Sequence, residues 1–281
     1  MQLLDGKATA QKIREELKVA VDRRKEGGQK IPHLAAVLVG SDGGSLTYVN
    51  AKVKACKKVG FSSTLVCLDE KVPESELLAE IEKINVNKDI DGLIVQLPLP
   101  NHIDEMKVTQ AISPNKDVDG FHPNNVGNLS SGYESSVPCT PLGCYLLIKK
   151  IEPNLSGKKA VVVGRSNLNG KPMTQLLLKE NCTVTITHSR TKDLKAECLE
   201  ADIIVAAVGI PELVKGDWVK KGTIVIDVGI NKTDKGIVGD VDFDEVSKNA
   251  KALTPVPGGV GPMTIACLLK NTIDCFKRSQ I

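Results

Sequence analysis

A strand-like apolar run enters a glycine-bearing turn and then a helix at Val161-Val162-Val163-Gly164-Arg165-Ser166-Asn167-Leu168-Asn169-Gly170. In doubly wound α/β sheets the first such turn holds a pyrophosphate, because glycine lets the backbone approach closely and the helix N-terminus offers free N–H groups. Only Gly164 and Gly170 remain of the G-x-G-x-x-G fingerprint. By itself the turn therefore fits a dinucleotide site and a plain turn equally well.

The end of the following strand favours NADP over NAD. NAD-type sites place an acid about 20 residues further on, where it binds the ribose 2′-hydroxyl. Here that region reads Thr187-His188-Ser189-Arg190-Thr191, which contains no acid. Ser189 and Arg190 suit a 2′-phosphate, since a guanidinium is a planar fork that is always charged, and Arg165 adds a second cation. The competing interpretation is that Arg190 is an ordinary surface cation.

Both halves of the chain alternate strand and helix patterns. Buried apolar runs predict strands at residues 34–39, 62–68, 92–97, 159–163, 183–187, 202–208 and 223–228. Helical spacing predicts a first helix that ends at Gly27-Gly28, and further helices at residues 45–58, 73–84, 141–150, 172–179 and 264–276. Residues 113–138 are rich in Asn, Ser, Gly and Pro and predict loops. The fold class is therefore α/β, with mostly parallel sheets in two domains.

Composition narrows the class of protein. The 281 residues fit two domains better than one, and a net charge of +3 gives no sign of a nucleic-acid partner. No run is long enough to cross a membrane, and the first residues lack the pattern of a signal peptide. The eight cysteines show neither C-x-x-C spacing nor a Cys/His cluster. We therefore expect reduced, mostly buried thiols, no metal and a cytoplasmic location.

Four polar residues in the first half suggest a second site. Tyr48 and Lys52 are four residues apart, so they share one face of the helix expected at residues 45–58. Gln96 ends a buried strand and Asp119 lies in a polar loop, and open sheets bind ligands at such places. A lysine in a dry cleft can lose its proton and serve in acid-base chemistry, and an aspartate can bind the N–H donors of a heterocycle. By spacing alone, a surface pair is the simpler interpretation of Tyr48 and Lys52, and a turn cap remains open for Asp119.

A rigid loop precedes the last expected helix at Pro255-Val256-Pro257-Gly258-Gly259-Val260-Gly261-Pro262. Proline restricts the backbone and glycine frees it, so this loop can hold main chain against a flat ligand or act as a domain hinge. Rigid turns beside ligands often use cis proline, and we predict that form at Leu97-Pro98 or Val256-Pro257.

Together these segments resemble the bifunctional methylenetetrahydrofolate dehydrogenase/methenyltetrahydrofolate cyclohydrolase family. The resemblance runs from near Leu4 to near Ile273. It is carried by several long motifs in the family's order: Tyr48-Val49-x-x-Lys52, Asp91-Gly92-Leu93-Ile94-Val95-Gln96-Leu97-Pro98-Leu99-Pro100, Lys116-Asp117-Val118-Asp119-Gly120-Phe121-His122, Pro138-Cys139-Thr140-Pro141, Val163-Gly164-Arg165-Ser166, Asp227-Val228-Gly229-Ile230-Asn231, Gly239-Asp240-Val241 and residues 254–264.

The resemblance implies a homodimer whose protomer has two α/β domains with a cleft between them. Residues 1–138, completed by a C-terminal helix at 262–281, would form the catalytic, folate-binding domain. Residues 139–261 would form the NADP-binding domain, a Rossmann-like doubly wound parallel sheet. The substrate 5,10-methylenetetrahydrofolate would give a hydride to NADP+, and water would open the methenyl product to 10-formyltetrahydrofolate. This one-carbon folate interconversion supports purine biosynthesis, and it implies no metal, nucleic acid or membrane.

The resemblance also implies roles for particular residues. Lys52 would be the main acid-base residue of the hydrolysis, and a neutral lysine would not repel the methenyl cation. Tyr48 would position the folate, Gln96 would tune Lys52, and Asp119 would hold the pterin edge. The other implied substrate-binding residues are Val95, Leu97, Pro257, Gly258, Gly259, Val260 and Gly261, and the implied cofactor-binding residues are Gly164, Arg165, Ser166, Ser189, Arg190 and Ile230.

The chain departs from the family pattern in two places, and two other interpretations of its function remain. Gly43-Gly44 stands where Pro-Ala is usual, which loosens the approach to the helix. Asn169 stands where Val or Ile is usual, which affects the packing of the cofactor turn. A two-domain NADP dehydrogenase of the shikimate type is one alternative, although segments 95–100 and 257–261 argue against it. A non-catalytic NADP-binding or scaffolding protein is the other, and the joint presence of the four polar residues disfavours it.

Overall fold

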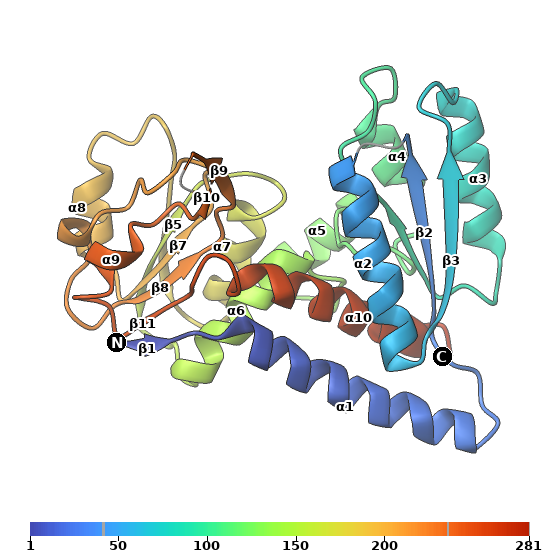
Figure 1. Ribbon diagram of the computed structural model, residues 1–281, viewed down its shortest axis with the longest axis horizontal. Helices are drawn as coiled ribbons and strands as arrows, with labels where there is room; N and C mark the ends of the chain where they lie inside the picture. The colour runs from blue at the N-terminus through green and yellow to red at the C-terminus, as the bar shows by residue number, and fades with distance from the viewer. Residues whose placement is uncertain (41–42, 235, 281) are drawn as a thin grey trace. The chain divides into compact units, whose positions relative to one another are not determined.

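The computed structural model describes residues 1–40, 43–234 and 236–280, and it divides into two compact units (Figure 1). Unit 1 comprises Met1–Gln11 and Pro138–Cys267, and unit 2 comprises Lys12–Val137 and Leu268–Ile281. Helices α1 (Gly6–Glu26) and α10 (Val260–Arg278) contribute residues to both units.

Unit 1 contains a six-stranded sheet in the order β1-β11-β8-β7-β5-β6, and all its strand pairs are parallel. The order runs outward from β5 in both directions, with β6 on one side and β7 on the other, which is the doubly wound arrangement of Rossmann-like sheets. The predicted α/β class is confirmed. The strands are β1 (Gln2–Leu3), β5 (Lys159–Val163), β6 (Thr183–Thr187), β7 (Ile203–Ala206), β8 (Ile224–Asp227) and β11 (Ala252–Leu253).

Helices cover both faces of this sheet because alternate strand residues point to opposite sides. Val161 and Ile204 pack in a core cluster with Cys198 of α8 (Leu194–Leu199) and Val246 of α9 (Phe243–Val246). Their neighbours Val162 and Val205 face α6 (Cys139–Ile151) and α7 (Gly170–Lys179). A short helix η1 (Gly216–Trp218) and the hairpin β9 (Asn231–Thr233) and β10 (Gly236–Val238) complete the unit.

Unit 2 contains a parallel three-stranded sheet in the order β3-β2-β4, made of β2 (His33–Val39), β3 (Ser62–Leu68) and β4 (Gly92–Val95). One face packs on α3 (Glu74–Val86) and α4 (Glu105–Ala111), where Val37 and Leu93 meet Leu77 and Val108. Helix α2 (Gly43–Val59) connects β2 to β3 and packs against both strands (Figure 1).

The loop predicted across residues 113–138 is wrong over α5 (Pro123–Ser131). The His122 side chain caps this helix by accepting a hydrogen bond from the Asn124 backbone N–H, and Pro123 occupies the first turn. Gly132 closes the helix in the left-handed conformation, with φ 80°. The Asn- and Ser-rich composition concealed the helix because its signals lie in the caps and not in an apolar stripe.

Several other predictions can be compared directly with the structure. Both Leu97-Pro98 and Val256-Pro257 are cis, as predicted. All eight cysteines are free and only Cys67 is exposed, which confirms the prediction of mostly buried thiols. Within residues 1–40, 43–234 and 236–280, no helix has the length and apolar character that a membrane span requires. Over the same ranges no three metal-binding side chains gather at one place.

Candidate active site

Lys52 and Gln96 meet at the carboxyl edge of the unit 2 sheet. Helix α2 follows β2, and Gln96 comes directly after β4, the neighbour of β2. Lys52 Nζ donates a hydrogen bond to Gln96 Oε1 at 2.9 Å. Gln96 Nε2 donates to the Leu97 carbonyl at 2.6 Å, and this second bond fixes which end of the amide faces the lysine. Gln96 thus gives Lys52 an acceptor without adding a charge.

Tyr48 lies one helical turn before Lys52 on α2. Its side chain is 52% exposed, whereas Lys52 is half-buried. The aromatic face is therefore accessible to a ligand on the side of the helix where Lys52 binds Gln96. The surface-pair interpretation of these two residues does not account for the bond from Lys52 to Gln96.

A buried carboxylate, Asp117, shapes the loop that carries Asp119. Asp117 Oδ1 accepts from the Gly120 backbone N–H at 2.9 Å. Asp117 Oδ2 accepts from the His122 backbone N–H and from Asn125 Nδ2, each at 2.9 Å. No sequence pattern singled out Asp117 as a site residue. An acid beside a buried strand and ahead of a polar loop could have indicated it, since buried charges need several partners.

The same loop is held against β4 and α10. Asp117 forms an isolated parallel bridge with Leu93 of β4. Asn271 of α10 donates its Nδ2 hydrogen to the Val118 carbonyl at 2.7 Å. The backbone is therefore fixed on both sides of Asp119, whose side chain is half-buried.

The proline- and glycine-rich loop at residues 255–262 belongs to unit 1, whereas the four polar residues above belong to unit 2. Its main chain is fixed by a hydrogen bond of 2.8 Å from Gly259 N to the Pro255 carbonyl, and by one of 3.2 Å from Lys7 N to the Gly258 carbonyl. A Cβ on Gly6 would collide with the Gly259 carbonyl, so the start of α1 packs directly on this loop. Its predicted role in folate binding remains a prediction.

The glycine turn after β5 depends on close backbone contacts. Gly164 has φ 115° and donates its N–H to the Thr187 carbonyl at 3.0 Å. A Cβ on Gly164 would collide with the Ala207 carbonyl, and one on Gly170 would collide with the Gly164 carbonyl. Glycine is therefore required at both positions, and α7 begins at Gly170. Ser166 Oγ accepts from the Asn169 backbone N–H at 3.1 Å.

Two guanidinium groups flank this turn. Arg165 follows β5, Arg190 follows β6, and the two strands pair along their whole length. His188 Nδ1 accepts from the Arg190 backbone N–H at 3.1 Å, which forms a tight turn with Ser189 and Arg190 exposed at its tip. Among the described residues neither guanidinium has an ion pair or a hydrogen-bond partner. Two exposed, unpaired cations at neighbouring strand ends suit a phosphate.

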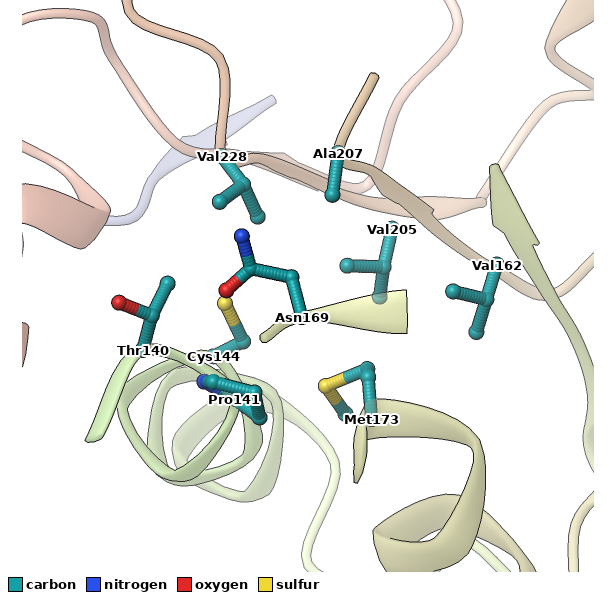
Figure 2. Close-up of a pocket in the computed structure, with 9 residues that line it drawn as sticks. All are labelled: Thr140, Pro141, Cys144, Val162, Asn169, Met173, Val205, Ala207 and Val228. Carbon is teal, nitrogen blue, oxygen red and sulfur yellow. The ribbon is translucent and has the colours of Figure 1, made fainter. Parts of the chain in front are cut away.

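A small, largely apolar pocket lies beside the same turn (Figure 2). Figure 2 shows the Asn169 carboxamide directed toward Cys144 and Val228. In the part of the chain that the structure describes, this carboxamide forms no hydrogen bond. Burial raises the pKa of the Cys144 thiol, so the thiol stays neutral beside it. The pocket is lined by Thr140, Pro141, Cys144, Val162, Asn169, Met173, Val205, Ala207 and Val228.

Ile230 follows β8 and is 55% exposed. The residues on either side of it bond to two buried carboxylates, since Gly229 N donates to Asp227 and Asn231 Nδ2 donates to Asp240. Burial raises the pKa of Asp227 to about 7. The motifs that contain these acids are visible in the sequence, but no pattern showed that the acids meet.

The doubly wound sheet and its glycine turn are those of a dinucleotide-binding α/β protein. One family model, the tetrahydrofolate dehydrogenase/cyclohydrolase catalytic domain, matches residues 4–119. A second, the tetrahydrofolate dehydrogenase/cyclohydrolase NAD(P)-binding domain, matches residues 138–280. The chain belongs to the tetrahydrofolate dehydrogenase/cyclohydrolase family.

Individual relatives agree with this assignment. The chain is 70% identical over 280 residues to the "Bifunctional protein FolD" of Pelagibacter ubique, with 100% of both chains covered. The crystal structure of the bifunctional FolD enzyme of Campylobacter jejuni superposes with a TM-score of 0.96 at 49% identity, covering 99% of each chain. The FolD structure from Trypanosoma brucei, complexed with NADP cofactor and an inhibitor, gives a TM-score of 0.92 at 39% identity, covering 98% of this chain and 97% of that one.

Proposed function

We propose that this protein oxidises 5,10-methylenetetrahydrofolate to the methenyl form with NADP+ and then hydrolyses that product to 10-formyltetrahydrofolate. The observation that carries the proposal is the 2.9 Å bond from Lys52 Nζ to Gln96 Oε1, which lies among the residues matched by the family's catalytic domain. A lysine held by a neutral acceptor at strand ends suits proton transfer beside a cation.

Lys52 handles the protons of the hydrolysis. Water adds to the methenyl carbon and loses a proton to the Lys52 amine, and the carbon–N5 bond then breaks. Lys52 returns its proton to N5, the hydroxyl proton of the intermediate passes to solvent as the formyl C=O forms on N10, and the lysine is regenerated. The Gln96 carbonyl oxygen accepts a hydrogen bond from Lys52 Nζ and so holds the amine in place at this edge of the sheet.

Other residues bind and orient the folate. Tyr48 presents its exposed ring to the folate, and the Asp119 carboxylate accepts hydrogen bonds from N–H groups of the pterin edge. Main chain at Val95 and Leu97 and in the loop Pro257, Gly258, Gly259, Val260 and Gly261 completes the set. The predicted boundary near residue 138 separates the proposed cofactor-binding residues from the proposed folate-binding residues, apart from the loop at residues 257–261.

The residues of unit 1 fit NADP+, which supplies the hydride acceptor when bound. The Gly164 turn, with Arg165 and Ser166, receives the pyrophosphate. Ser189 and Arg190 bind the 2′-phosphate, and Ile230 lies against the cofactor. The support is the pair of exposed guanidinium groups at neighbouring strand ends, together with the absence of an acid from the turn after β6. A related structure that holds NADP adds weight.

A direct assay tests the proposal. The protein is mixed with 5,10-methylenetetrahydrofolate and NADP+, and both NADPH and 10-formyltetrahydrofolate are measured. We expect both products, with slower turnover when NAD+ replaces NADP+. Absence of turnover with either cofactor refutes the proposal, and oxidation of shikimate in a parallel assay would favour the shikimate-type alternative.

We also propose a cytoplasmic homodimer with no nucleic-acid or membrane partner. Strand β3 lies at an edge of its sheet, and its Leu65 is 37% exposed, so this edge can accept a second copy. Eight free cysteines suit a reducing compartment. Light scattering coupled to size-exclusion chromatography should give twice the protomer mass, and a monomer mass would contradict the dimer.

A further inference from the structure

Two buried aspartates lie near the carboxyl ends of the strands in unit 1, where the cofactor is proposed to bind. Asp227 ends β8 and is 4% exposed, and Asp240 follows β10 and is 0% exposed. Within the described ranges neither carboxylate forms a salt bridge. Because an unpaired buried charge is costly, these acids depend on the hydrogen bonds that they accept.

Asp227 ties the loop after β8 to the segment after β10. Its Oδ1 accepts from Gly229 N at 3.0 Å and from Asp240 N at 2.8 Å. Its Oδ2 accepts from Val241 N at 3.0 Å. A Cβ on Gly239 would collide with this carboxylate, so glycine is needed there for the two segments to approach.

Asp240 ties the loop after β7 to the loop after β8. Its Oδ2 accepts from Val208 N at 2.7 Å and from Gly209 N at 3.0 Å. Its Oδ1 accepts from Asn231 Nδ2 at 2.9 Å. All three donors lie outside the six-stranded sheet, so Asp240 holds the ligand-facing loops and not the sheet itself.

These loops are the surroundings of the proposed cofactor. The Gly164 turn packs against the Ala207 carbonyl, directly before Val208. The exposed Ile230 stands between Gly229 and Asn231, each of which donates to one of the two carboxylates. Movement of either acid would therefore shift Ile230 and the backbone at Ala207 that the Gly164 turn contacts.

We propose that Asp240, held by Asp227, is a positioning residue for NADP+: it sets the main chain at residues 208–209 and the direction of Ile230. The inference rests on the proposed binding of NADP+. Asp240 does not touch the cofactor in this proposal and acts through the two loops. Its loss should weaken cofactor binding and leave the chemistry of Lys52 intact.

The test is Asp240→Asn in the full-length protein. An amide accepts at one end only, so either orientation sets an NH2 group against the Val208 and Gly209 N–H groups or against Asn231 Nδ2. We expect the dissociation constant and the KM for NADP+ to rise about tenfold, as for loss of a hydrogen bond to a charged group. The kcat of oxidation and the cyclohydrolase rate should stay within about twofold, because Asp240 acts only through the two loops.

Two further variants complete the test. Asn231→Ala removes a single hydrogen-bond donor to Asp240 and should raise the dissociation constant for NADP+ about threefold. If Asp240→Asn does not fold, this variant tests the inference in its place. Asp242→Asn is the matched control, since Asp242 caps α9 and pairs with Lys215. Unchanged NADP+ affinity in Asn231→Ala, or an equal loss in Asp242→Asn, overturns the inference. If the unaltered protein neither binds nor reduces NADP+, the proposed function fails and the inference fails with it.

Discussion

The residues at the carboxyl edges of the two sheets are arranged in different ways. In unit 2 two functional side chains meet directly, as Lys52 donates to Gln96. In unit 1 the exposed cations Arg165 and Arg190 have no partner among the described residues, and buried carboxylates hold the loops after β7 and β8. The difference fits the two proposed tasks. Proton transfer needs one amine in a set position, whereas a dinucleotide needs a shaped main chain and unoccupied cations.

Substitutions in the two arrangements should also have different effects on activity and cofactor binding. A change at Lys52 should remove one reaction and leave the cofactor site intact. A change among the buried carboxylates or the cations should weaken the cofactor site and leave hydrolysis intact. Measuring both activities and NADP+ binding for every variant distinguishes these two outcomes.

Lys52→Met should have the largest effect. The substitution removes the proposed proton carrier, and general acid–base catalysis contributes about 10²–10⁴-fold, so cyclohydrolase activity should fall by that factor. The dissociation constant for NADP+ should not change. Hydrolysis is followed by loss of the methenyl substrate, and folding by circular dichroism.

The matched control for that variant is Lys54→Met. Lys54 is an exposed lysine on the same helix, two residues further on, and the structure shows it in no bond to Gln96. It should hydrolyse at the unaltered rate. Normal hydrolysis by Lys52→Met would refute the role given to Lys52, and an equal loss in both variants would point to damage to α2.

Arg190→Ala should weaken binding of NADP+ but not of NAD+. Charge-assisted hydrogen bonds to a phosphate are worth about 1.5–3 kcal/mol, so the KM for NADP+ should rise about 10- to 100-fold at low salt. Lys192→Ala is the control, because Lys192 is an exposed cation two residues away. Equal effects on both cofactors would mean that the 2′-phosphate is held elsewhere, with Arg165 as the first candidate.

Asp227→Asn should change how stability depends on pH. Burial raises the pKa of Asp227 to about 7, above the value of about 3.9 in an unfolded chain. Between these values the folded state holds a proton that the unfolded state has lost, so the contribution of Asp227 to stability falls as pH rises through 7. From pH 6 to 8 the unaltered protein should lose about 1 kcal/mol relative to the variant.

Urea unfolding at several pH values measures this difference, with the fluorescence of Trp218, the single tryptophan, as the reporter of unit 1. Asp240 is the ionisable neighbour of Asp227, and it is present in both proteins. Parallel pH profiles for the two proteins would show that Asp227 does not titrate in this range.

The sequence predicted most of the helices and strands and named the candidate site residues, but the spacing of those residues did not predict which of them contact one another. Strands β3, β5 and β6 have the predicted bounds because β-branched runs between turns specify strands locally. Helix α5 was missed because caps at His122 and Gly132 define it. The meeting of Lys52 with Gln96, and of Asp227 with Asp240, joins distant parts of the chain. No local pattern records such a contact, so spacing alone could not establish it.

Asn169→Val should have the smallest effect. It tests whether Asn169, the one residue of the cofactor turn that departs from the family pattern, lowers the stability of the protein. The Asn169 carboxamide is half-buried beside apolar groups and has no hydrogen bond within the described residues (Figure 2). A polar group placed in this way costs about 1 kcal/mol, so Val should raise the melting temperature of unit 1 by about 2–4 °C. Asn167→Val, at an exposed position in the same turn, should give no such gain. If the valine at position 169 instead lowers stability or raises the KM for NADP+, the carboxamide has a partner in the working enzyme, and the turn would then resemble the Lys52 site, where one side chain holds another.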